Sequence, residues 1–377
     1  MSSKTLSPKE RFVVIMAGGR GERFWPVSRQ NTPKQLIRLL GDRSLLQQAV
    51  DRVLPLAPAE NVLVITNAAQ AREVRRQLPG LPKNNIIAEP CGRDTCAAVA
   101  LGAALVGQRS KNAVMAVLPA DHVIPTPKSF QLVLREAFAI ANGSDTLVTI
   151  GIKPTEPATG YGYILTGAPL DTTASTGKPT KTPFFKAERF VEKPSLERAT
   201  EYLATGKYRW NAGMFIWSYR SIAKALQTHQ PELAKASERW LNAAALGRLD
   251  KTLATDYPTI AKISVDYALM EKATNVAVAD GNFEWDDLGA WPALARHLAA
   301  DAAGNCSVGD FIHTDSSGNI VFDARTKTRT LTAIIGLQDC IVVHTDDATL
   351  VAHKAKAQKI KDLVGELAKT ERFKSLL

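Results

Sequence analysis

The feature that most constrains this chain is a short apolar run that ends in a cluster of glycines. Residues 11–16 read RFVVIM, a β-branched and aromatic segment that predicts a buried strand, and AGGRGERFWP follows directly. A strand that leaves the core through a glycine turn is typical of the edge of a nucleotide site in α/β folds. We therefore expect a buried strand whose carboxyl end opens onto a binding loop.

Strand-like and helix-like segments then alternate over the first part of the chain. This alternation predicts an α/β fold with a doubly wound, Rossmann-like sheet that is mixed but mostly parallel, in which ligands gather beyond the carboxyl ends of the strands. The expected helices lie at 45–54, 68–78 and 97–108, and the expected strands at 61–66, 86–88 and 113–118. A Thr-, Ser- and Pro-rich run at 168–186 predicts a surface excursion.

The pattern changes near residue 300, where the short strand-like pieces FIHT, NIVFDA, LTAIIG and CIVVHT are separated by glycine and aspartate turns. We expect two domains, an α/β domain at 1–298 and a small β-rich domain at 299–377. The β pieces are compatible with a few turns of a solenoid, a left-handed β-helix-like arrangement among them. Apolar residues at helical spacing predict a closing helix over 354–374. We expect this second domain to serve assembly, with a homodimer as the first expectation.

Composition restricts the partners. The net charge of the 377 residues is +10, but the Lys and Arg residues are dispersed, which argues against a nucleic-acid partner. The first apolar run is too short for a signal sequence or a membrane span. Four cysteines without CxxC spacing indicate neither a zinc site nor a disulfide framework, and they suit a reducing compartment. We expect a cytoplasmic protein without a membrane partner.

The glycine loop fits neither of the two most familiar phosphate-binding patterns. No GK[ST] follows at the spacing of a Walker A loop, and the third glycine of GxGxxG would fall on Phe24. Glycines in such a loop let backbone N–H groups approach phosphate oxygens. Arg20, Arg23 and Lys34 are close enough in sequence to serve one triphosphate. The alternative is a tight turn followed by surface cations.

The longer segment AGGRGERFWPVSRQNTPKQL resembles the signature of sugar-1-phosphate nucleotidylyltransferases, AGGxGxRLxPxTxxxPK, with Lys34 at the final lysine. WPxSR and PKQ resemble the mannose-1-phosphate guanylyltransferase branch of that family. The motifs EPCGRDT, LPADH, YGYI, FVEKPS, WNAGMFIW, SVDYALMEK and WDDLGAW follow in family order, so the resemblance spans residues 11–291.

The resemblance implies nucleotidyl transfer from GTP to mannose 1-phosphate, giving GDP-mannose and pyrophosphate, with Mg²⁺ as cofactor. Two alternatives stay open. One is the same reaction with another base or another sugar 1-phosphate, such as heptose or glucose. The other is a noncatalytic regulatory relative that binds nucleotide sugars.

The chemistry of this reaction needs alignment and charge stabilisation more than acid–base catalysis. A phosphate has a second pKa of about 6, so the attacking sugar phosphate is already ionised at neutral pH. Mg²⁺ binds through one or two carboxylates beside substrate phosphates. The resemblance assigns the metal to Asp121 and Asp287, although Asp286 is an alternative to Asp287, and we expect a structural role for His122. The catalytic residues it implies are Arg23, Lys34, Asp121, Lys193 and Asp287.

The resemblance also implies two groups of binding residues. Nucleotide binding falls on Ala17, Gly18, Gly19, Arg20, Gly21, Glu89, Pro90, Arg93, Asp94 and Thr95. Sugar-phosphate binding falls on Gly162, Glu192, Lys193 and Asn211. Two positions depart from the branch. Asp94 stands where Asn is common, which leaves the residue's contact with the base undetermined. Ala290 stands where Ser or Thr is usual, which leaves undetermined whether a hydroxyl is present near the metal.

Overall fold

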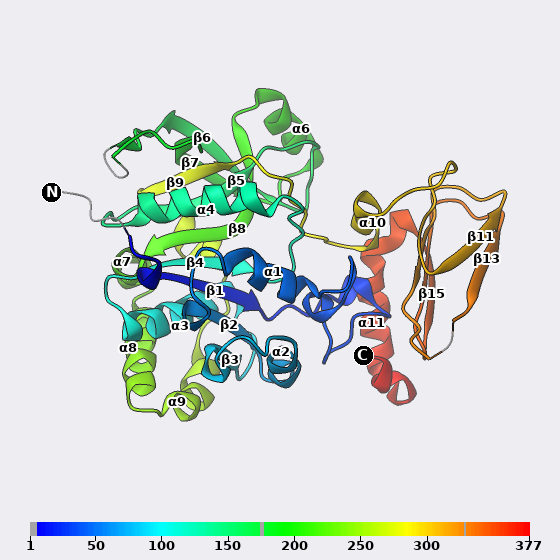
Figure 1. Cartoon of the computed structure of the whole chain (residues 1–377), viewed down its shortest axis with the longest axis horizontal. Coiled ribbons are helices and arrows are strands. Elements are labelled where there is room, and N and C mark those ends of the chain that lie inside the picture. Colours follow the sequence, from blue (N-terminus) through cyan, green and yellow to red (C-terminus); the bar gives the residue numbers. More distant parts are fainter. Residues whose placement is uncertain (1–5, 174–176, 328) are drawn as a thin grey trace.

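The computed structural model of the chain describes residues 6–173, 177–327 and 329–377. Within these residues the largest element is a nine-stranded sheet in the order β3-β2-β1-β4-β8-β5-β9-β7-β6 (Figure 1). Its strands are β1 (Arg11–Ala17), β2 (Val62–Asn67), β3 (Ile86–Glu89), β4 (Val114–Pro119), β5 (Leu147–Ile152), β6 (Gly162–Pro169), β7 (Phe184–Glu192), β8 (Tyr208–Ser218) and β9 (Val276–Gly281).

The direction of the strands agrees with the prediction in one half of the sheet and departs from it in the other. β3, β2, β1 and β4 are parallel neighbours, as the alternation of strands and helices predicts. β8, however, lies antiparallel to β4, β5 and β6, and β7 lies antiparallel to β6 and β9. The sheet is therefore mixed, as expected, but the expectation that parallel pairings dominate is wrong for the half that begins at β8.

The antiparallel half closes on itself. The carboxyl half of β8 pairs with β4, whereas its first residues pair with β6. From β6 the pairing continues through β7, β9 and β5, and β5 returns to β8. The predicted excursion at 168–186 largely coincides with the segment between β6 and β7. Only its ends differ, because Ala168 and Pro169 belong to β6 and residues 184–186 belong to β7. Residues 174–176 lie outside the described part of that segment.

Helices cover both faces of the sheet. The α-helices are α1 (Leu45–Val53), α2 (Ala71–Gln77), α3 (Asp94–Arg109), α4 (Pro127–Ala141), α6 (Leu196–Thr205), α7 (Tyr219–His229), α8 (Pro231–Ala245), α9 (Leu249–Asp256), α10 (Trp291–Leu294) and α11 (Ile360–Lys369). The short helical turns are η1 (Pro8–Glu10), η2 (Glu22–Phe24), η3 (Lys34–Leu36), η4 (Ala59–Asn61), η5 (Lys83–Asn85), η6 (Tyr257–Thr259), η7 (Asp266–Met270), η8 (Ala295–His297), η9 (Lys354–Lys359) and η10 (Glu371–Leu376).

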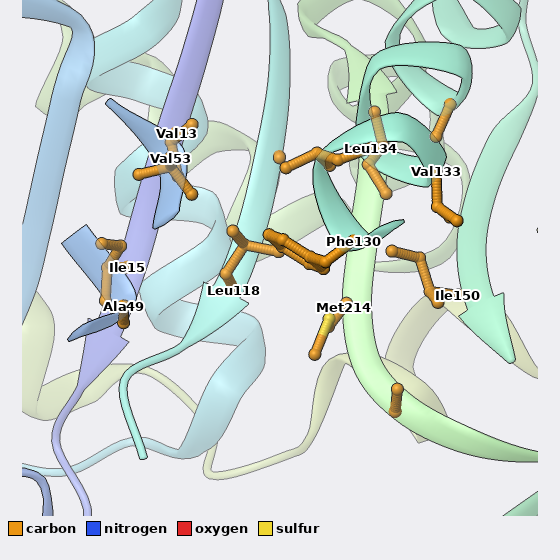
Figure 2. Close-up of a cluster of buried hydrophobic side chains, with 14 of the residues drawn as sticks. Val13, Ile15, Ala49, Val53, Leu118, Phe130, Val133, Leu134, Ile150 and Met214 are labelled. Carbon is orange, nitrogen blue, oxygen red and sulfur yellow. The ribbon is translucent and has the colours of Figure 1, made fainter. Parts of the chain in front are cut away.

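β1 shows how the two cores are divided. Successive side chains of a strand point to opposite faces, so Val13 and Ile15 enter one core with α1 and α4, whereas Phe12 and Val14 enter the other with α3, α7 and α8. Figure 2 shows Val13 and Ile15 in the first core, together with side chains from α1 and α4. On the second face, a Cβ added at Gly102 of α3 would lie 3.0 Å from Val14, so this small-residue helix packs tightly on the sheet.

The C-terminal part is a β coil. Its strands are β10 (Cys306–Val308), β11 (Asp310–Thr314), β12 (Ile320–Asp323), β13 (Leu331–Ile335), β14 (Cys340–His344) and β15 (Thr349–His353). They alternate between two small parallel sheets, β10-β12-β14 and β11-β13, and β15 adds antiparallel to β14. The amide of Asn319 links the turns by donating to Asn305 and to Leu337 and accepting from the backbone of Cys340. The solenoid expectation is therefore confirmed.

A third hydrophobic cluster joins the first and last parts of the chain. Phe24, Trp291, Phe322 and Ile360 are buried in it together. The helix expected over 354–374 is present as three consecutive pieces, η9, α11 and η10. Figure 1 shows α11 lying against the segment that follows β1. Of the helices in the described residues, none has the length and apolar character to cross a membrane.

Candidate functional site

The glycine loop leaves β1 at Ala17 and folds back onto Lys34. Gly21 has a φ of 61°, in the left-handed region, and a Cβ there would lie 2.5 Å from Cβ of Lys34. Only glycine allows both this conformation and this approach. The side-chain amide of Gln35 donates to the backbone oxygens of Ala17 and Gly19 at 2.9 and 3.0 Å. The glycine loop is therefore held in place by the TPKQL segment, which belongs to the same sequence signature.

Two cavities meet at the carboxyl ends of β1 and β4. The larger, of about 490 Å³, extends from the glycine loop toward β3 on one side and β6 and β8 on the other. The smaller, of about 330 Å³, lies on the other side of the loop. Asp121, His122 and Asp287 line both, so the two form one continuous cleft.

Most of the predicted site residues line this cleft. Those on the larger cavity are Ala17, Gly18, Gly19, Glu89, Arg93, Asp94, Thr95, Asp121, Gly162, Glu192, Asn211 and Asp287. Those on the smaller cavity are Arg20, Gly21, Arg23, Lys34, Asp121 and Asp287. Pro90 and Lys193 line neither.

Lys34 lies at the centre of the acidic part of the cleft. Its Nζ is 2.8 Å from Oδ2 of Asp121 and donates to the backbone oxygens of Asp287 and Leu288 at 2.7 and 3.1 Å. Burial of the Asp121 carboxylate opposes its ionisation, but the positive charge of Lys34 outweighs this, so the pKa of Asp121 is lowered. The carboxylate keeps 35% side-chain exposure toward the cleft.

The adjacent carboxylates of Asp286 and Asp287 have different surroundings. Asp286 is 5% exposed, and its oxygens accept from the backbone of Leu288, from Arg296 at 2.8 Å and from His297 at 2.9 Å. Burial opposes ionisation, but the hydrogen bonds from His297 and Arg296 lower the pKa of Asp286 to about 2. Asp287 instead faces the cleft, which makes it the better placed of the two to hold a metal.

The donor set fits a magnesium ion held largely by substrate. Asp121 and Asp287 supply carboxylate oxygens to one cleft, and Oδ1 of Asp287 accepts from the hydroxyl of Tyr161 at 2.9 Å. Nδ1 of His122 accepts a hydrogen bond from Trp285 at 3.0 Å, which fits the structural role expected of this histidine. Among the described residues no group of three or more His, Cys, Asp and Glu side chains is arranged for a metal. Two carboxylates suffice for Mg²⁺ when phosphates and water complete its shell.

One end of the larger cavity contains a buried carboxyl group. Glu89, at the end of β3, is 7% exposed, and Tyr257 donates a short hydrogen bond to its Oε1. Burial raises the pKa of Glu89 to about 7, against the opposing effect of the Tyr257 hydroxyl. A Cβ on Gly18 would lie 3.3 Å from Oε2 of Glu89, so this carboxyl group lies directly against the glycine loop.

The segment after Glu89 has an unusual backbone at Asp94. This residue has a φ of 63°, and its side chain accepts from the backbone of Thr95 at 2.8 Å. Asn and Asp are the residues other than glycine that most readily adopt this conformation. The backbone therefore accommodates Asp in place of the Asn that is common in the branch. Arg93 donates to the backbone oxygen of Pro258, and Thr95 accepts from the backbone of Val265 at 2.9 Å.

The other end of the larger cavity is lined by Gly162, Glu192, Asn211 and Asp266. A Cβ on Gly162 would lie 2.6 Å from Oε2 of Glu192 and 3.4 Å from Cβ of Asn211, so a larger residue there would have to displace the Glu192 carboxylate. The amide of Asn211 donates to Asp266 at 2.7 Å and accepts from the backbone of Gly213 at 3.1 Å. Burial raises the pKa of Asp266. Glu192, Asn211 and Asp266 thus present polar groups of fixed orientation.

Three expected residues lie elsewhere. The side chain of Lys193 is 64% exposed, and its Nζ bonds to Glu192 at 2.7 Å at the end of β7. This ion pair between neighbouring residues engages the lysine that the resemblance assigns to the sugar phosphate. The phosphate-binding role of Lys193 stays a prediction. Pro90 lies beside the cleft without lining it. Ala290 is buried in the third hydrophobic cluster rather than on the cleft.

Sequence reasoning missed several cleft residues. Gln35 and Asp266 were signalled by their motifs, PKQ and SVDYALMEK, but were given no role. Tyr161 lies in the YGYI motif and was likewise given no role, and the structure shows its hydroxyl donating to Asp287. Lys361, which lines the smaller cavity, had no signal because it comes from the closing helix.

A glycine loop at the end of β1, facing an acidic cleft across parallel strands, is the arrangement of a nucleotidyl transferase. The family described as Nucleotidyl transferase matches residues 12–304, and the MannoseP isomerase/GMP-like beta-helix domain matches residues 309–367.

Similar individual proteins identify the branch of this family to which the chain belongs. A mannose-1-phosphate guanylyltransferase from Klebsiella pneumoniae is 38% identical over 363 residues, covering 95% of this chain and 74% of that protein. The xanthan biosynthesis protein XanB of Xanthomonas campestris pv. campestris (strain B100) is 38% identical over 361 residues, covering 94% of this chain and 72% of that protein. A crystal structure from Thermus thermophilus, described as a mannose-1-phosphate geranyltransferase, has a TM-score of 0.83 at 34% identity and covers 95% of this chain and 99% of that one. The chain therefore belongs to the mannose-1-phosphate guanylyltransferase family.

Proposed function

We propose that this protein transfers the guanylyl group of GTP to mannose 1-phosphate, giving GDP-mannose and pyrophosphate. A sugar-phosphate oxygen forms a bond to the α-phosphorus, and the bond from that phosphorus to the bridging oxygen of the leaving pyrophosphate breaks. The observation that carries the proposal is the continuous cleft in which Lys34, Asp121 and Asp287 meet between a polar sugar-sized end and a glycine loop.

The residues of the chain would align two anions and offset their charge. Arg20 and Arg23 supply positive charge on the smaller cavity, and loop N–H groups can face phosphate oxygens. Lys34 fixes Asp121 and the backbone at Asp287 in relation to the loop. Such alignment of reactants converts a bimolecular step into an effectively unimolecular one, which can lower the barrier by about 7 to 11 kcal/mol.

Asp121 and Asp287 are proposed to hold Mg²⁺. When bound, the ion would neutralise charge on the phosphates of the nucleotide. Tyr161 orients Asp287 through a hydrogen bond, and burial, together with the charge of Asp287, raises the pKa of Tyr161, so its hydroxyl stays a donor.

Base and sugar would occupy opposite ends of the larger cavity. Guanine presents N–H donors. A site rejects the wrong base most strongly when that base leaves buried polar groups of the site unpaired, and an apolar wall discriminates less. Glu89, Arg93, Asp94 and Thr95 are the proposed contacts for base and ribose. Gly162, Glu192 and Asn211, with Asp266 behind Asn211, are the proposed contacts for mannose 1-phosphate, together with Lys193 if its exposed side chain turns inward.

A substrate panel tests the proposal. Pyrophosphate release is measured with GTP, ATP, UTP and dTTP, each against mannose, glucose and heptose 1-phosphates, with and without Mg²⁺. The expected result is Mg²⁺-dependent release that is fastest for GTP with mannose 1-phosphate. A faster rate with another pair would replace the substrates and keep the reaction class. Absence of release with every pair, while nucleotide sugars still bind, would favour the noncatalytic alternative.

The assignment of Asp121 needs its own control. Asp121→Asn should abolish release while circular dichroism shows an unchanged fold. Lys128→Ala, an exposed lysine on α4, serves as a control substitution away from the cleft and should leave the rate unchanged. Full activity of Asp121→Asn would remove this residue from the mechanism.

We further propose a cytoplasmic homodimer. All four cysteines are free, which suits a reducing compartment. Ile312, Leu331 and Ile335 are exposed together on the β11–β13 sheet, with 56, 61 and 77% exposure, and an apolar face of this kind supports assembly through the C-terminal part. Analytical ultracentrifugation of the protein and of Ile335→Asp tests this, because the variant should shift the dimer toward monomer.

A further inference from the structure

The smaller cavity receives one side chain from the far end of the chain. Lys361, the second residue of α11, lines this cavity together with Arg20, Arg23 and Lys34. The other three cations belong to the sequence signature near the N-terminus, more than three hundred residues away. The closing helix therefore contributes a charge to a cavity that the glycine loop builds.

The position of α11 is fixed by contacts to the loop. Ile360, which precedes Lys361, is 2% exposed and is buried in the same cluster as Phe24 of η2. The indole of Trp25 donates to the backbone oxygen of Leu376 at 2.8 Å, and Arg29 donates to the same oxygen. The helical segment that contains Lys361 is thus tied to the loop at both ends. Figure 1 shows α11 beside the segment that follows β1.

The ionic partners on this cavity are unevenly distributed. Nζ of Lys34 is bonded to Asp121 and to backbone oxygens, and Nη1 of Arg20 lies 3.6 Å from Oε1 of Glu22. The side chain of Lys361 makes no hydrogen bond or ion pair with any residue in the described part of the chain, and the same holds for the side chain of Arg23. These two cations are therefore free to bind an anion that enters the cavity.

The geometry of the cleft indicates which anion this is. Asp121 and Asp287 line the boundary of the two cavities, so the reacting phosphorus belongs there if the proposed function holds. The base end near Glu89 and the sugar end near Asn211 both lie on the larger cavity. The smaller cavity then remains for the phosphates beyond the reacting one.

We propose that Lys361 binds the part of the nucleoside triphosphate that leaves as pyrophosphate. The C-terminal helix then completes the substrate site, and the loop and the helix bind the leaving group together. This inference rests on the proposed function for the identity of the ligand.

The experiment uses the full chain with Lys361→Met, which keeps the length of the side chain and removes its charge. Lys359→Met is the matched control, because Lys359 is an exposed lysine two residues earlier that lines neither cavity. Steady-state kinetics are measured in both directions. We expect Lys361→Met to raise the KM of pyrophosphate and of GTP about 10-fold, the usual effect of losing one charge-assisted hydrogen bond. The KM of GDP-mannose and of mannose 1-phosphate should not change, and Lys361→Arg should restore most of the loss.

Three results would overturn the inference. One is an active wild-type protein in which Lys361→Met and Lys359→Met have the same KM for pyrophosphate. Another is an equal rise in the KM of all four substrates, because that pattern reflects a disturbed fold. If the wild-type protein shows no transfer with any substrate pair, the proposed function fails, but the binding site at Lys361 can still be tested. Calorimetric titration of the variants with pyrophosphate alone then decides whether Lys361 binds this anion. Weaker binding by Lys361→Met than by Lys359→Met would then support the site, and equal binding would reject it.

Discussion

Nζ of Lys34 lies 2.8 Å from Oδ2 of Asp121 and 2.7 Å from the backbone oxygen of Asp287. A third bond, to the backbone oxygen of Leu288, uses the last of the three donors that an ammonium group has. Lys34 is thus saturated by the protein and would have to release a partner to donate to a phosphate. We infer that it acts mainly as a positioning residue, whose charge also favours anionic substrates.

Lys34→Met should therefore lower both stability and turnover. Breaking a buried ion pair costs about 3 to 5 kcal/mol, and we expect about 2 kcal/mol here because Asp121 is partly exposed to the cleft. Urea unfolding gives the free energy, and pyrophosphate release gives the rate. The double variant Lys34→Met with Asp121→Asn is the control. If Lys34 and Asp121 interact as described, the double variant should be less destabilised than the sum of the two single variants.

The glycine loop offers a test with an internal control. Gly21→Ala places a Cβ 2.5 Å from Cβ of Lys34 at a φ of 61°, so it should cost at least about 1 to 2 kcal/mol and disturb the Lys34 contacts. At Gly19 an added Cβ meets nothing within 4 Å, so Gly19→Ala should stay within about 0.5 kcal/mol of the wild type. Thermal unfolding of the two variants compares them directly. Equal stability would mean that the loop does not pack on Lys34.

Asp286 and Asp287 should separate stability from catalysis. Asp286→Asn loses charge-assisted bonds to Arg296 and His297 and should lower the free energy of unfolding at pH 7. Its folded pKa of about 2 lies below the ordinary value of 3.8, so this contribution is present above about pH 4 and is lost as the pH falls toward 2. The wild type and Asp286→Asn should therefore become equally stable in acid, as urea unfolding at several pH values can show.

Asp287→Asn should have the opposite profile. Its carboxylate faces the cleft, so the substitution should reduce Mg²⁺-dependent pyrophosphate release by orders of magnitude and change the unfolding free energy little. Catalysis that fails in Asp286→Asn but survives in Asp287→Asn would move the metal site to Asp286.

The first half of the fold was predictable because its signals are local. The alternation of apolar strands and helices, and the glycines after residue 16, determine β1 to β4 and the loop with little help from distant residues. The antiparallel position of β8 between β4 and β5 was not predictable, because strand order depends on pairing between segments far apart in sequence. The same holds for Lys361, which reaches the cleft only because α11 packs on Phe24.

Within the site, motifs identified residues but not their partners. Asp286 and Asp287 are neighbours in WDDLG, and only the positions of Arg296 and His297 distinguish them. Lys193 has a strong motif, yet its side chain pairs with Glu192 and does not itself line the cleft. The burial of Glu89 was likewise invisible in EPCGRDT, because the hydroxyl that covers it comes from Tyr257.

The raised pKa of Glu89 predicts a pH-dependent cost to the fold. Its pKa is about 7 in the folded protein, above the ordinary value of 4.5, because burial disfavours the charged form. The folded state therefore binds the proton more tightly, so the stability linked to Glu89 is complete below about pH 4.5 and is lost as the pH rises to 7. Glu89→Gln has no such titration. Its stability relative to the wild type should rise between pH 4.5 and 7 and then stay constant, as urea unfolding from about pH 4 to about pH 9 can measure. Tyr257→Phe, which removes the hydrogen bond and keeps the ring, should raise the pKa of Glu89 and move the upper end of this window to higher pH. A difference between the wild type and Glu89→Gln that does not vary with pH would show that folding does not raise the pKa of Glu89.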